Sequence, residues 1–255
     1  MMPGKWMRLP VEASAHAPQV DAMIVSVHWL IAAIALVFVV FFVVCLVRFN
    51  RRAHPRARHR NVSPRFAWIL VTAITAVELW QLFVVAIPLW ASRVSSIPSG
   101  PDTTVIRVVA QQYSWNIHYP GADGRFGRTS ASLISRFNPL GLDRTDPLAK
   151  DDIFTINEFY FPVGKPVLVQ LTSKDMIHSF SLPQMRVKQD AIPGMMIPVW
   201  FLPTVATPDG ETWEINCSQL CGLGHYGMRG LYRSMKPEEF RQFLDDEAAA
   251  LKAES

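Results

Sequence analysis

The chain has few cysteines and lacks two familiar motifs. Only Cys45, Cys217 and Cys221 occur in its 255 residues, and no C-x-x-C-H sequence is present, so no haem is attached through that motif. Residues 1–20 lack a continuous apolar core, which argues against a signal peptide and leaves residues 1–22 as a short N-terminal arm. The length accommodates one soluble domain plus membrane spans, but not several large domains.

Acidic residues are absent from the segment between two long apolar runs. Residues 23–49 and 66–91 are each long enough to cross a hydrocarbon layer, which takes about 20 helical residues, so we predict a transmembrane hairpin. Cys45 lies in the first span and is expected to act as a small apolar side chain. The loop of residues 50–65 is basic, which favours the cytoplasmic side, contact with anionic lipid and both chain ends outside. Its arginines are Arg51, Arg52, Arg56, Arg58, Arg60 and Arg65.

Charge divides the chain into two parts. Residues 1–99 carry ten Lys and Arg against three acidic residues, a net +7, whereas residues 100–255 carry fifteen against eighteen, a net −3. The basic pI of 9.1 therefore describes the membrane-facing part. A mildly acidic outer domain would steer a basic partner, with an association rate that falls as salt rises.

The second half of the chain has the pattern of a β domain. Residues 92–104 are rich in Ser, Pro and Gly and predict a linker. The runs beyond it predict an antiparallel sandwich or barrel, with residues 130–150 as loop. Residues 236–255 predict a helix that packs on the barrel through Phe240, Leu244, Ala248 and Leu251. The predicted strands are Val105–Ala110, Tyr113–Tyr119, Ile153–Phe161, Val167–Thr172, Met195–Phe201 and Thr212–Asn216.

The most informative stretch has the form C-x-x-x-C-x-x-x-H-x-x-M and runs from Cys217 to Met228. Its thiols, imidazole and thioether are soft and borderline donors that suit copper, and interleaved glycines allow the backbone to turn tightly. A blue copper site needs one Cys, so two thiols suit two metal ions. Taken alone, the cysteines could also form a disulfide or a thiol redox pair, and His178 and Met228 could be core residues.

Together with the segment Lys188–Gly194, which reads K-Q-D-A-I-P-G, this motif resembles subunit II of the haem-copper cytochrome c oxidases. The resemblance implies a membrane-anchored all-β fold, in which a two-helix transmembrane hairpin precedes a cupredoxin-like Greek-key β-barrel over residues 105–235. It also implies a dinuclear copper centre of the CuA type. The implied ligands are His178, Cys217, Cys221, His225, Met228 and the backbone carbonyl of Gln219.

The same resemblance implies an electron-transfer role as an enzyme subunit. Electrons would come from cytochrome c and pass to the haems of subunit I, where oxygen is reduced and protons are pumped. The expected partners are subunit I, other oxidase subunits, cytochrome c and membrane lipid, but no nucleic acid. The expected location is the bacterial inner membrane, with both termini and the copper domain on the periplasmic side.

Several other classes share parts of this pattern. A membrane-anchored copper chaperone or thiol redox protein would have C-x-x-x-C and a distant His, but chaperones of this kind typically have one span and lack H-x-x-M. Subunit II of quinol oxidases has lost the copper ligands. Nitrous oxide reductase carries a similar loop but needs a second catalytic domain, for which this chain is too short.

Two positions near the copper motif, Tyr113 and Gln219, depart from the usual family pattern. The tryptophan that takes up electrons aligns with Tyr113, and the next tryptophan with Trp115, so either aromatic could serve; both could also simply pack in the sheet. Gln219 replaces the usual Glu, whose carboxylate binds magnesium at the contact with subunit I. Because a neutral amide is a poorer ligand for a hard cation, we expect copper binding to persist and the magnesium site to be weak or absent.

Glu78 lies near the middle of the second apolar run. A carboxyl group at that depth costs a few kcal/mol, so it should face protein or water. Thr72, Thr75, Glu78 and Gln81 recur every three residues and predict a polar seam. The family's glutamate at the start of this span is replaced by Arg65, so Glu78 could assist proton delivery, or it could form a structural hydrogen bond with subunit I.

Overall fold

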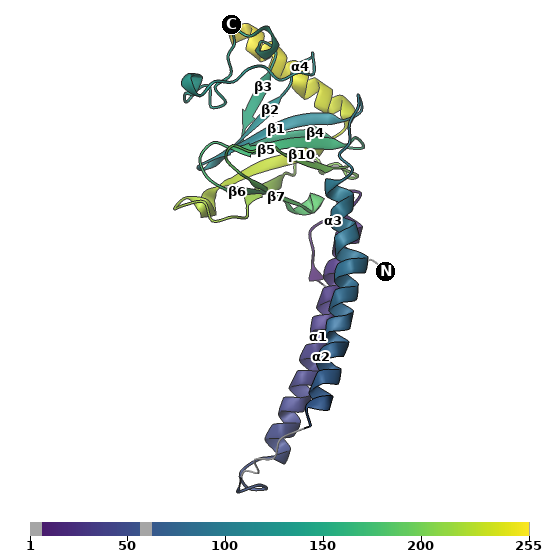
Figure 1. Cartoon of the computed structure of the whole chain (residues 1–255). Helices are drawn as coiled ribbons and strands as arrows, with labels where there is room; N and C mark the ends of the chain where they lie inside the picture. Colours follow the sequence, from purple (N-terminus) through teal and green to yellow (C-terminus); the bar gives the residue numbers. More distant parts are fainter. Residues whose placement is uncertain (1–6, 57–62, 255) are drawn as a thin grey trace. The chain divides into compact units, whose positions relative to one another are not determined.

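The computed structural model of the chain describes residues 7–56 and 63–254. Arg58 and Arg60 of the predicted loop, residues 1–6 of the predicted arm and residue 255 of the predicted C-terminal helix lie outside the described residues. The chain forms two compact units, which are described separately (Figure 1). One is formed mainly by Gln19–Ser92, and the other by Pro10–Pro18 together with the chain from Arg93 onward.

The first unit is a helical hairpin. Helix α1 spans Ala17–Arg48, and the returning segment consists of α2 (Pro64–Trp80), the π-helix η2 (Gln81–Ala86) and α3 (Ile87–Val94). Both arms, Ala17–Arg48 and Pro64–Val94, are long and apolar enough to cross a membrane. The arms lie side by side (Figure 1), and Gln81 Nε2 donates to Ser26 Oγ at 3.4 Å. The π-helix ends two residues before Pro88, which lacks the amide hydrogen that an α-helix would use at this position.

The second unit contains two five-stranded sheets, in the orders β3-β2-β1-β5-β8 and β4-β10-β9-β6-β7. Large buried side chains from both sheets meet between them, among them Trp115, Phe159, Phe180 and Phe201. The predicted two-layer β domain is therefore present. The strands are β1 (Thr104–Gln111), β2 (Ser114–Tyr119), β3 (Ile153–Ile156), β4 (Glu158–Pro162), β5 (Val167–Ser173), β6 (His178–Leu182), β7 (Val187–Ala191), β8 (Ile197–Phe201), β9 (Trp213–Cys217) and β10 (Arg229–Met235).

The predicted antiparallel sandwich also contains parallel pairs, which the sequence analysis did not predict. β1 pairs in parallel with β5, and β4 pairs in parallel with β10, while the other pairs are antiparallel. The parallel pairs arise because the chain passes between the two sheets before each returning strand joins its neighbour. Side-chain alternation along a strand shows which residues are buried, but it does not reveal the direction of the partner.

The predicted strand Ile153–Phe161 is divided at Asn157, which adopts φ 61°. β3 before it belongs to one sheet and β4 after it to the other. The Asn157 side chain accepts a hydrogen bond from the Trp115 amide at 2.8 Å, and its carbonyl accepts one from the Leu231 amide at 2.6 Å. Asparagine tolerates the left-handed conformation, so this residue forms the corner that connects the sheets.

Part of the predicted N-terminal arm is built into the β domain. Ala13 is fully buried, and its amide and carbonyl bond to the Gln184 carbonyl and the Thr204 amide, each at 2.9 Å. Ser14 Oγ donates to the Met185 carbonyl at 2.7 Å. This contact could not be predicted from local sequence patterns, because the Ser14 partner Met185 lies 171 residues away along the chain.

At the other end, α4 (Pro237–Glu254) packs on the domain as the sequence predicts. Phe240 is buried, and the apolar side chains that follow it on the same face pack against the core. Phe243 adds ring contacts to Tyr119 and Tyr160, with centroid distances of 5.6 and 4.7 Å.

Candidate metal centre

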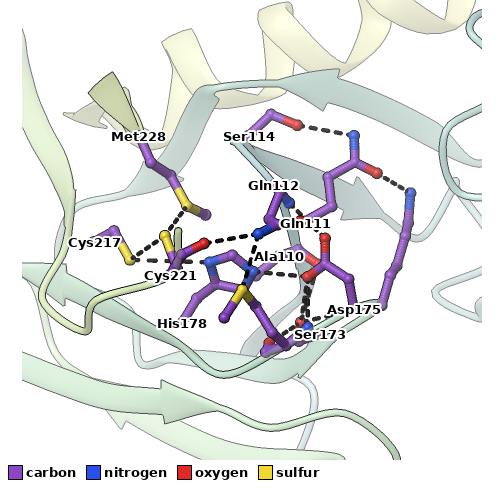
Figure 2. Close-up of polar contacts among 12 residues, drawn as sticks. Ala110, Gln111, Gln112, Ser114, Ser173, Asp175, His178, Cys217, Cys221 and Met228 are labelled. Atoms are coloured by element: carbon purple, nitrogen blue, oxygen red, sulfur yellow. Dashed lines mark hydrogen bonds and ion pairs between the residues drawn. The ribbon is translucent and has the colours of Figure 1, made fainter. Parts of the chain in front are cut away.

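Elements of the second sheet bring the predicted donors together at one end of the β domain. His178 begins β6, Cys217 ends β9, and the loop between β9 and β10 carries the other donors. The ligand atoms of His178, Cys217 and Cys221 all lie within 4.8 Å of one another. His178 Nδ1 is 4.0 Å from Cys217 Sγ, and the two sulfurs are 3.7 Å apart, so both thiols are free (Figure 2).

The remaining predicted donors surround the same pair of sulfurs. Cys221 Sγ lies 3.5 Å from His225 Nδ1 and 3.6 Å from Met228 Sδ. On the other side, Cys217 Sγ lies 3.2 Å from the Gln219 carbonyl oxygen. All six donors predicted from the sequence are therefore neighbours, with one imidazole beside each thiol.

Burial differs between the donors. Cys221 and His178 are fully buried and Met228 is 2% exposed, while Cys217 and His225 are partly exposed. Burial and the adjacent Cys217 thiol raise the pKa of Cys221 to about 11. The Cys221 thiol therefore keeps its proton at neutral pH, and a metal ion must displace that proton on binding.

A carboxylate outside the predicted set holds His178 in place. Asp175 Oδ1 accepts from His178 Nε2 at 2.8 Å, which leaves Nδ1 directed at Cys217 (Figure 2). Partial burial raises the pKa of Asp175, but hydrogen bonds from the Gln112 amide, His178 and the Met176 amide outweigh it and keep the pKa below its usual value. The sequence signal for this residue is an acid three positions before the histidine, which the motif analysis missed.

Gln112 joins this carboxylate to the loop Cys217–Met228, here called the copper-type loop. Its amide nitrogen donates to Asp175 Oδ2 at 2.7 Å, and its side-chain Nε2 donates to the Cys221 carbonyl at 2.9 Å (Figure 2). One residue thus fixes both the carboxylate behind His178 and the backbone of Cys221. The sequence analysis passed over Gln112 in favour of its aromatic neighbours.

The donor set fits two copper ions. Two thiols between two imidazoles, with a thioether and a backbone carbonyl at the periphery, offer soft and borderline ligands to two neighbouring metal positions. The hydrogen-bonded carboxylate behind one imidazole is the usual support of a metal-binding histidine.

Comparison with known proteins agrees with this geometry. A sequence model described as "Cytochrome C oxidase subunit II, periplasmic domain" matches residues 104–234. The chain is 30% identical to the alternative cytochrome c oxidase subunit 2 of Bradyrhizobium diazoefficiens, over 89% of this chain and 80% of the relative. It is 28% identical to cytochrome c oxidase subunit 2 of Cereibacter sphaeroides, over 89% of this chain and 78% of the relative.

The chain belongs to the cytochrome c oxidase subunit II family. Among solved structures, the periplasmic domain of subunit II (CoxB) of Bradyrhizobium japonicum shares 28% identity, with a TM-score of 0.43 over 61% of this chain and 99% of that one. Family membership confirms the predicted fold class, with two apolar helices followed by a cupredoxin-like β domain. It identifies a membrane-anchored protein whose β domain is of the periplasmic type.

The two aromatic residues of this subunit II chain that were predicted as electron-entry candidates, Tyr113 and Trp115, differ in their exposure. Tyr113 lies in the turn before β2, not on the buried strand face expected for it, and is 38% exposed. Its ring lies against the copper-type loop, since a Cβ on Gly224 would come within 2.6 Å of it. Trp115 is fully buried beside the rings of His178 and Phe180. Trp115 is therefore not part of the exposed surface.

Three apolar side chains of the same loop are strongly exposed. Leu220, Leu223 and Tyr226 are 76%, 97% and 92% exposed. Exposed apolar side chains on a loop that carries buried donors are typical of an interaction surface.

The hairpin carries the last predicted site residue. Glu78 is exposed on α2, and its side chain has no hydrogen bond or ion pair within residues 7–56 and 63–254. Thr72 and Thr75 of the predicted seam are also exposed, whereas Gln81 is partly buried and bonds to Ser26 of α1. The seam is therefore divided between the surface of the hairpin and the contact between its two arms.

Proposed function

We propose that this chain is the electron-accepting subunit of a respiratory haem-copper oxidase, with a dinuclear copper centre held by His178, Cys217, Cys221, His225, Met228 and the Gln219 carbonyl. The observation that carries the proposal is the convergence of all six donors around two sulfurs 3.7 Å apart. A bound copper pair would supply one-electron transfer between cytochrome c and the haems of subunit I.

The surrounding residues prepare this site for electron transfer. Asp175 fixes the tautomer and orientation of His178, and Gln112 holds the loop backbone at Cys221. Met228 and Cys221 exclude water from the inner side of the site. Because β6 and β9 form neighbouring strands of one sheet, His178 and Cys217 are held by a rigid framework.

Copper stoichiometry tests the proposal directly. The full chain, loaded with copper in detergent, should bind two copper ions and show an electron paramagnetic resonance signal from one unpaired electron shared by two copper nuclei. Cys217→Ser should abolish this signal, because one of the two thiolates is lost. One copper per chain with a blue-copper spectrum would refute the dinuclear site, and a stable Cys217–Cys221 disulfide that excludes copper would favour a thiol redox protein.

We place electron uptake at Tyr113 and at the exposed apolar side chains of the loop that its ring contacts. The net charge of −3 over residues 100–255 suits a basic cytochrome c as the donor. Turnover with cytochrome c should slow as ionic strength rises, since screening weakens long-range attraction. Turnover that is independent of salt would argue against electrostatic docking.

Gln219, which stands in place of the family's usual glutamate, affects the binding of magnesium. Its side chain is exposed, so an amide replaces the carboxylate that would face subunit I. We expect weak or no magnesium binding there while copper binding persists. Tightly bound magnesium contacting Gln219 in the assembled oxidase would contradict this.

For the hairpin, we propose two spans at residues 23–49 and 66–91 in a bacterial inner membrane, with both termini and the β domain on the periplasmic side. Between and beyond them we propose a basic cytoplasmic loop at 50–65, a linker at 92–104, a copper domain at 105–235 and a helix at 236–255.

Exposed Glu78 would then face subunit I rather than lipid, since a lipid-facing carboxyl group is costly. Glu78→Gln keeps the shape and removes the exchangeable proton, so slower proton pumping in the assembled variant would assign Glu78 to proton delivery, and unchanged pumping would make it structural.

A further inference from the structure

Gln111 and Gln112 are consecutive glutamines at the end of β1, and their side chains reach different parts of the β domain. Gln111 Oε1 accepts from Lys174 Nζ at 2.5 Å. Lys174 Nζ also donates to the carbonyl of Pro139, which lies in the segment of residues 120–152 between β2 and β3, here called the covering segment. The Gln112 side chain instead points at the copper-type loop (Figure 2). The same chemical group can therefore be compared on and off the candidate metal centre.

The side-chain nitrogen of Gln112 has two partners, and both lie beside the donor set. Nε2 donates to the Cys221 carbonyl at 2.9 Å and to Met176 Sδ at 3.0 Å. A side-chain amide carries two donor hydrogens, so both are used here. The Met176 amide in turn donates to Asp175 Oδ1 at 2.7 Å, the same oxygen that accepts from His178. Gln112 therefore links the backbone of Cys221 to the turn that supports His178.

The peptide that joins Cys221 to Gly222 lies directly against Gln112. Gly222 has φ 117°, in the left-handed region that glycine adopts at little steric cost. A Cβ at this position would come within 2.8 Å of Gln112 Nε2 and 2.7 Å of Tyr113 Oη. Because glycine allows the backbone many conformations, the chain itself restrains this peptide little. The hydrogen bond from Gln112 Nε2 to the Cys221 carbonyl supplies the restraint.

The restrained peptide stands between two of the predicted copper ligands. On one side is Cys221, which is fully buried and whose sulfur lies 3.7 Å from Cys217 Sγ. On the other side, the carbonyl of Gly222 accepts a hydrogen bond from the His225 amide at 3.1 Å. A rotation of the Cys221–Gly222 peptide would therefore displace the turn that carries the second imidazole. The side chain of Gln112 opposes that rotation.

The same hydrogen bond has an electrostatic effect on the site. Gln112 presents the positive end of an N–H dipole to Cys221, the residue that carries the buried thiol. Hydrogen bonding around a cysteine ligand tunes the reduction potential of copper sites. A reduced copper pair carries one positive charge less than an oxidised pair, so the positive end of a nearby dipole favours the reduced state. The Gln112 amide should therefore raise the reduction potential.

We propose that Gln112 is a positioning residue for the copper pair, a role that rests on the proposed function. Its side-chain amide holds the Cys221–Gly222 peptide and joins it to Met176. Its backbone amide holds Asp175, the carboxylate behind His178. Both sides of the donor set are thereby ordered in the metal-free chain, so less ordering remains to be done on metal binding and copper affinity rises. The dipole of the side chain adds a higher reduction potential.

Gln112→Leu tests this role in the full chain, loaded with copper in detergent. Leucine is similar in size and has no side-chain donor, and the variant keeps the backbone amide that bonds to Asp175. We expect two coppers to remain bound, with copper affinity about tenfold weaker in competition with a chelator. Redox titration of the copper absorption should give a lower reduction potential than in the parent.

Two further measurements separate the hydrogen bond from simple packing. Gln112→Glu keeps the shape but places a carboxylate beside the Cys221 carbonyl, and because negative charge favours the oxidised copper pair, its potential should be lower than that of Gln112→Leu. In the metal-free chain, hydrogen exchange of the His225 amide should be faster in Gln112→Leu than in the parent, because its turn is less restrained. A Gln112→Glu potential above the parent's, or parent-like exchange in Gln112→Leu, would overturn the hydrogen bond as the cause.

Gln111→Leu is the matched control, because it makes the same change one residue earlier, where the side chain bonds to Lys174 and Ser114. Its copper affinity and reduction potential should equal the parent's. Parent-like values in Gln112→Leu, or equal losses in both leucine variants, would overturn the positioning role, while the parent's shared-electron signal would leave the proposed function standing. A parent chain without that signal would refute the copper pair and this role with it.

Discussion

The copper-type loop, Cys217–Met228, and the covering segment, residues 120–152, use polar side chains in opposite ways. In the loop, sulfur and nitrogen donors converge on one another and leave positions for metal ions. In the covering segment, polar groups mostly bind the protein itself, as when Arg144 donates to the Ala149 and Asp152 carbonyls at 2.5 and 2.9 Å. Substitutions in the two regions should therefore separate stability from metal binding.

The largest expected effect on stability lies in the covering segment. Asp152→Ala removes the partner of His118 and of the Gly127 amide, together with the carboxylate that attracts Arg107. Each buried donor left without a partner costs about 1–3 kcal/mol, so the free energy of unfolding should fall by roughly 2–5 kcal/mol. Chemical denaturation of the full chain in detergent measures it.

The copper spectrum of Asp152→Ala shows whether metal binding is independent of this loss of stability. The folded fraction of Asp152→Ala should show the parent's copper spectrum, because Asp152 contacts none of the donors. Asp209→Asn is a suitable control, since it removes the charge of an exposed aspartate on the β8–β9 connection and should leave stability within about 0.5 kcal/mol of the parent. A parent-like denaturation curve for Asp152→Ala would show that the buried pair does not hold the segment.

The same contrast explains how much could be predicted from sequence. The five side-chain donors were predicted because four lie within twelve residues at fixed spacing, and because the family resemblance implies the distant His178 as the fifth. The covering segment gave only weak local signals, because its order depends on Asp152 meeting His118, 34 residues away. Local patterns report chemistry that neighbouring residues share, but not contacts that form only on folding.

The strands show a similar limit. β1 and β5 were predicted from β-branched runs, whereas β6, β7 and β10 were missed because polar or charged residues interrupt them. The parallel pairing of β10 with β4 was equally hidden, since it depends on the corner at Asn157. The buried Ala13 shows that a short segment with no strong pattern can still complete a core.

A smaller effect on stability is expected when Asp175, the carboxylate that accepts a hydrogen bond from His178, is replaced. Asp175→Asn keeps the size of the side chain but can present its amide nitrogen to His178 Nε2, which destabilises the tautomer that directs Nδ1 at the metal. Loss of such a partner typically weakens metal binding by about 10–100-fold, and we expect the lower end because β6 still fixes the backbone. Competition with a chelator measures copper affinity, and the copper hyperfine splitting reports the altered ligand.

In Asp175→Asn the unfolding free energy of the metal-free chain should change by less than about 1 kcal/mol, because the carboxylate is partly exposed. This is the reverse of the result expected for Asp152→Ala. If Asp175→Asn instead lowers stability as much as Asp152→Ala and leaves copper affinity unchanged, the two regions do not divide their roles as the geometry indicates.

The smallest effect concerns Gly224, where the loop meets Tyr113. Gly224 has φ −92°, which alanine adopts readily, so the only obstacle to Gly224→Ala is the Tyr113 ring, 2.6 Å from the new Cβ. Because Tyr113 is 38% exposed and can move outward, the cost should be about 1 kcal/mol, at the low end for overpacking. The displaced ring should slow reduction by cytochrome c several-fold while two coppers remain bound. Gly227→Ala is the matched control in the same loop, since nothing lies within 4 Å of its Cβ position, and it should leave the rate unchanged. Equal rates for the two variants would remove Tyr113 from the path of electron uptake.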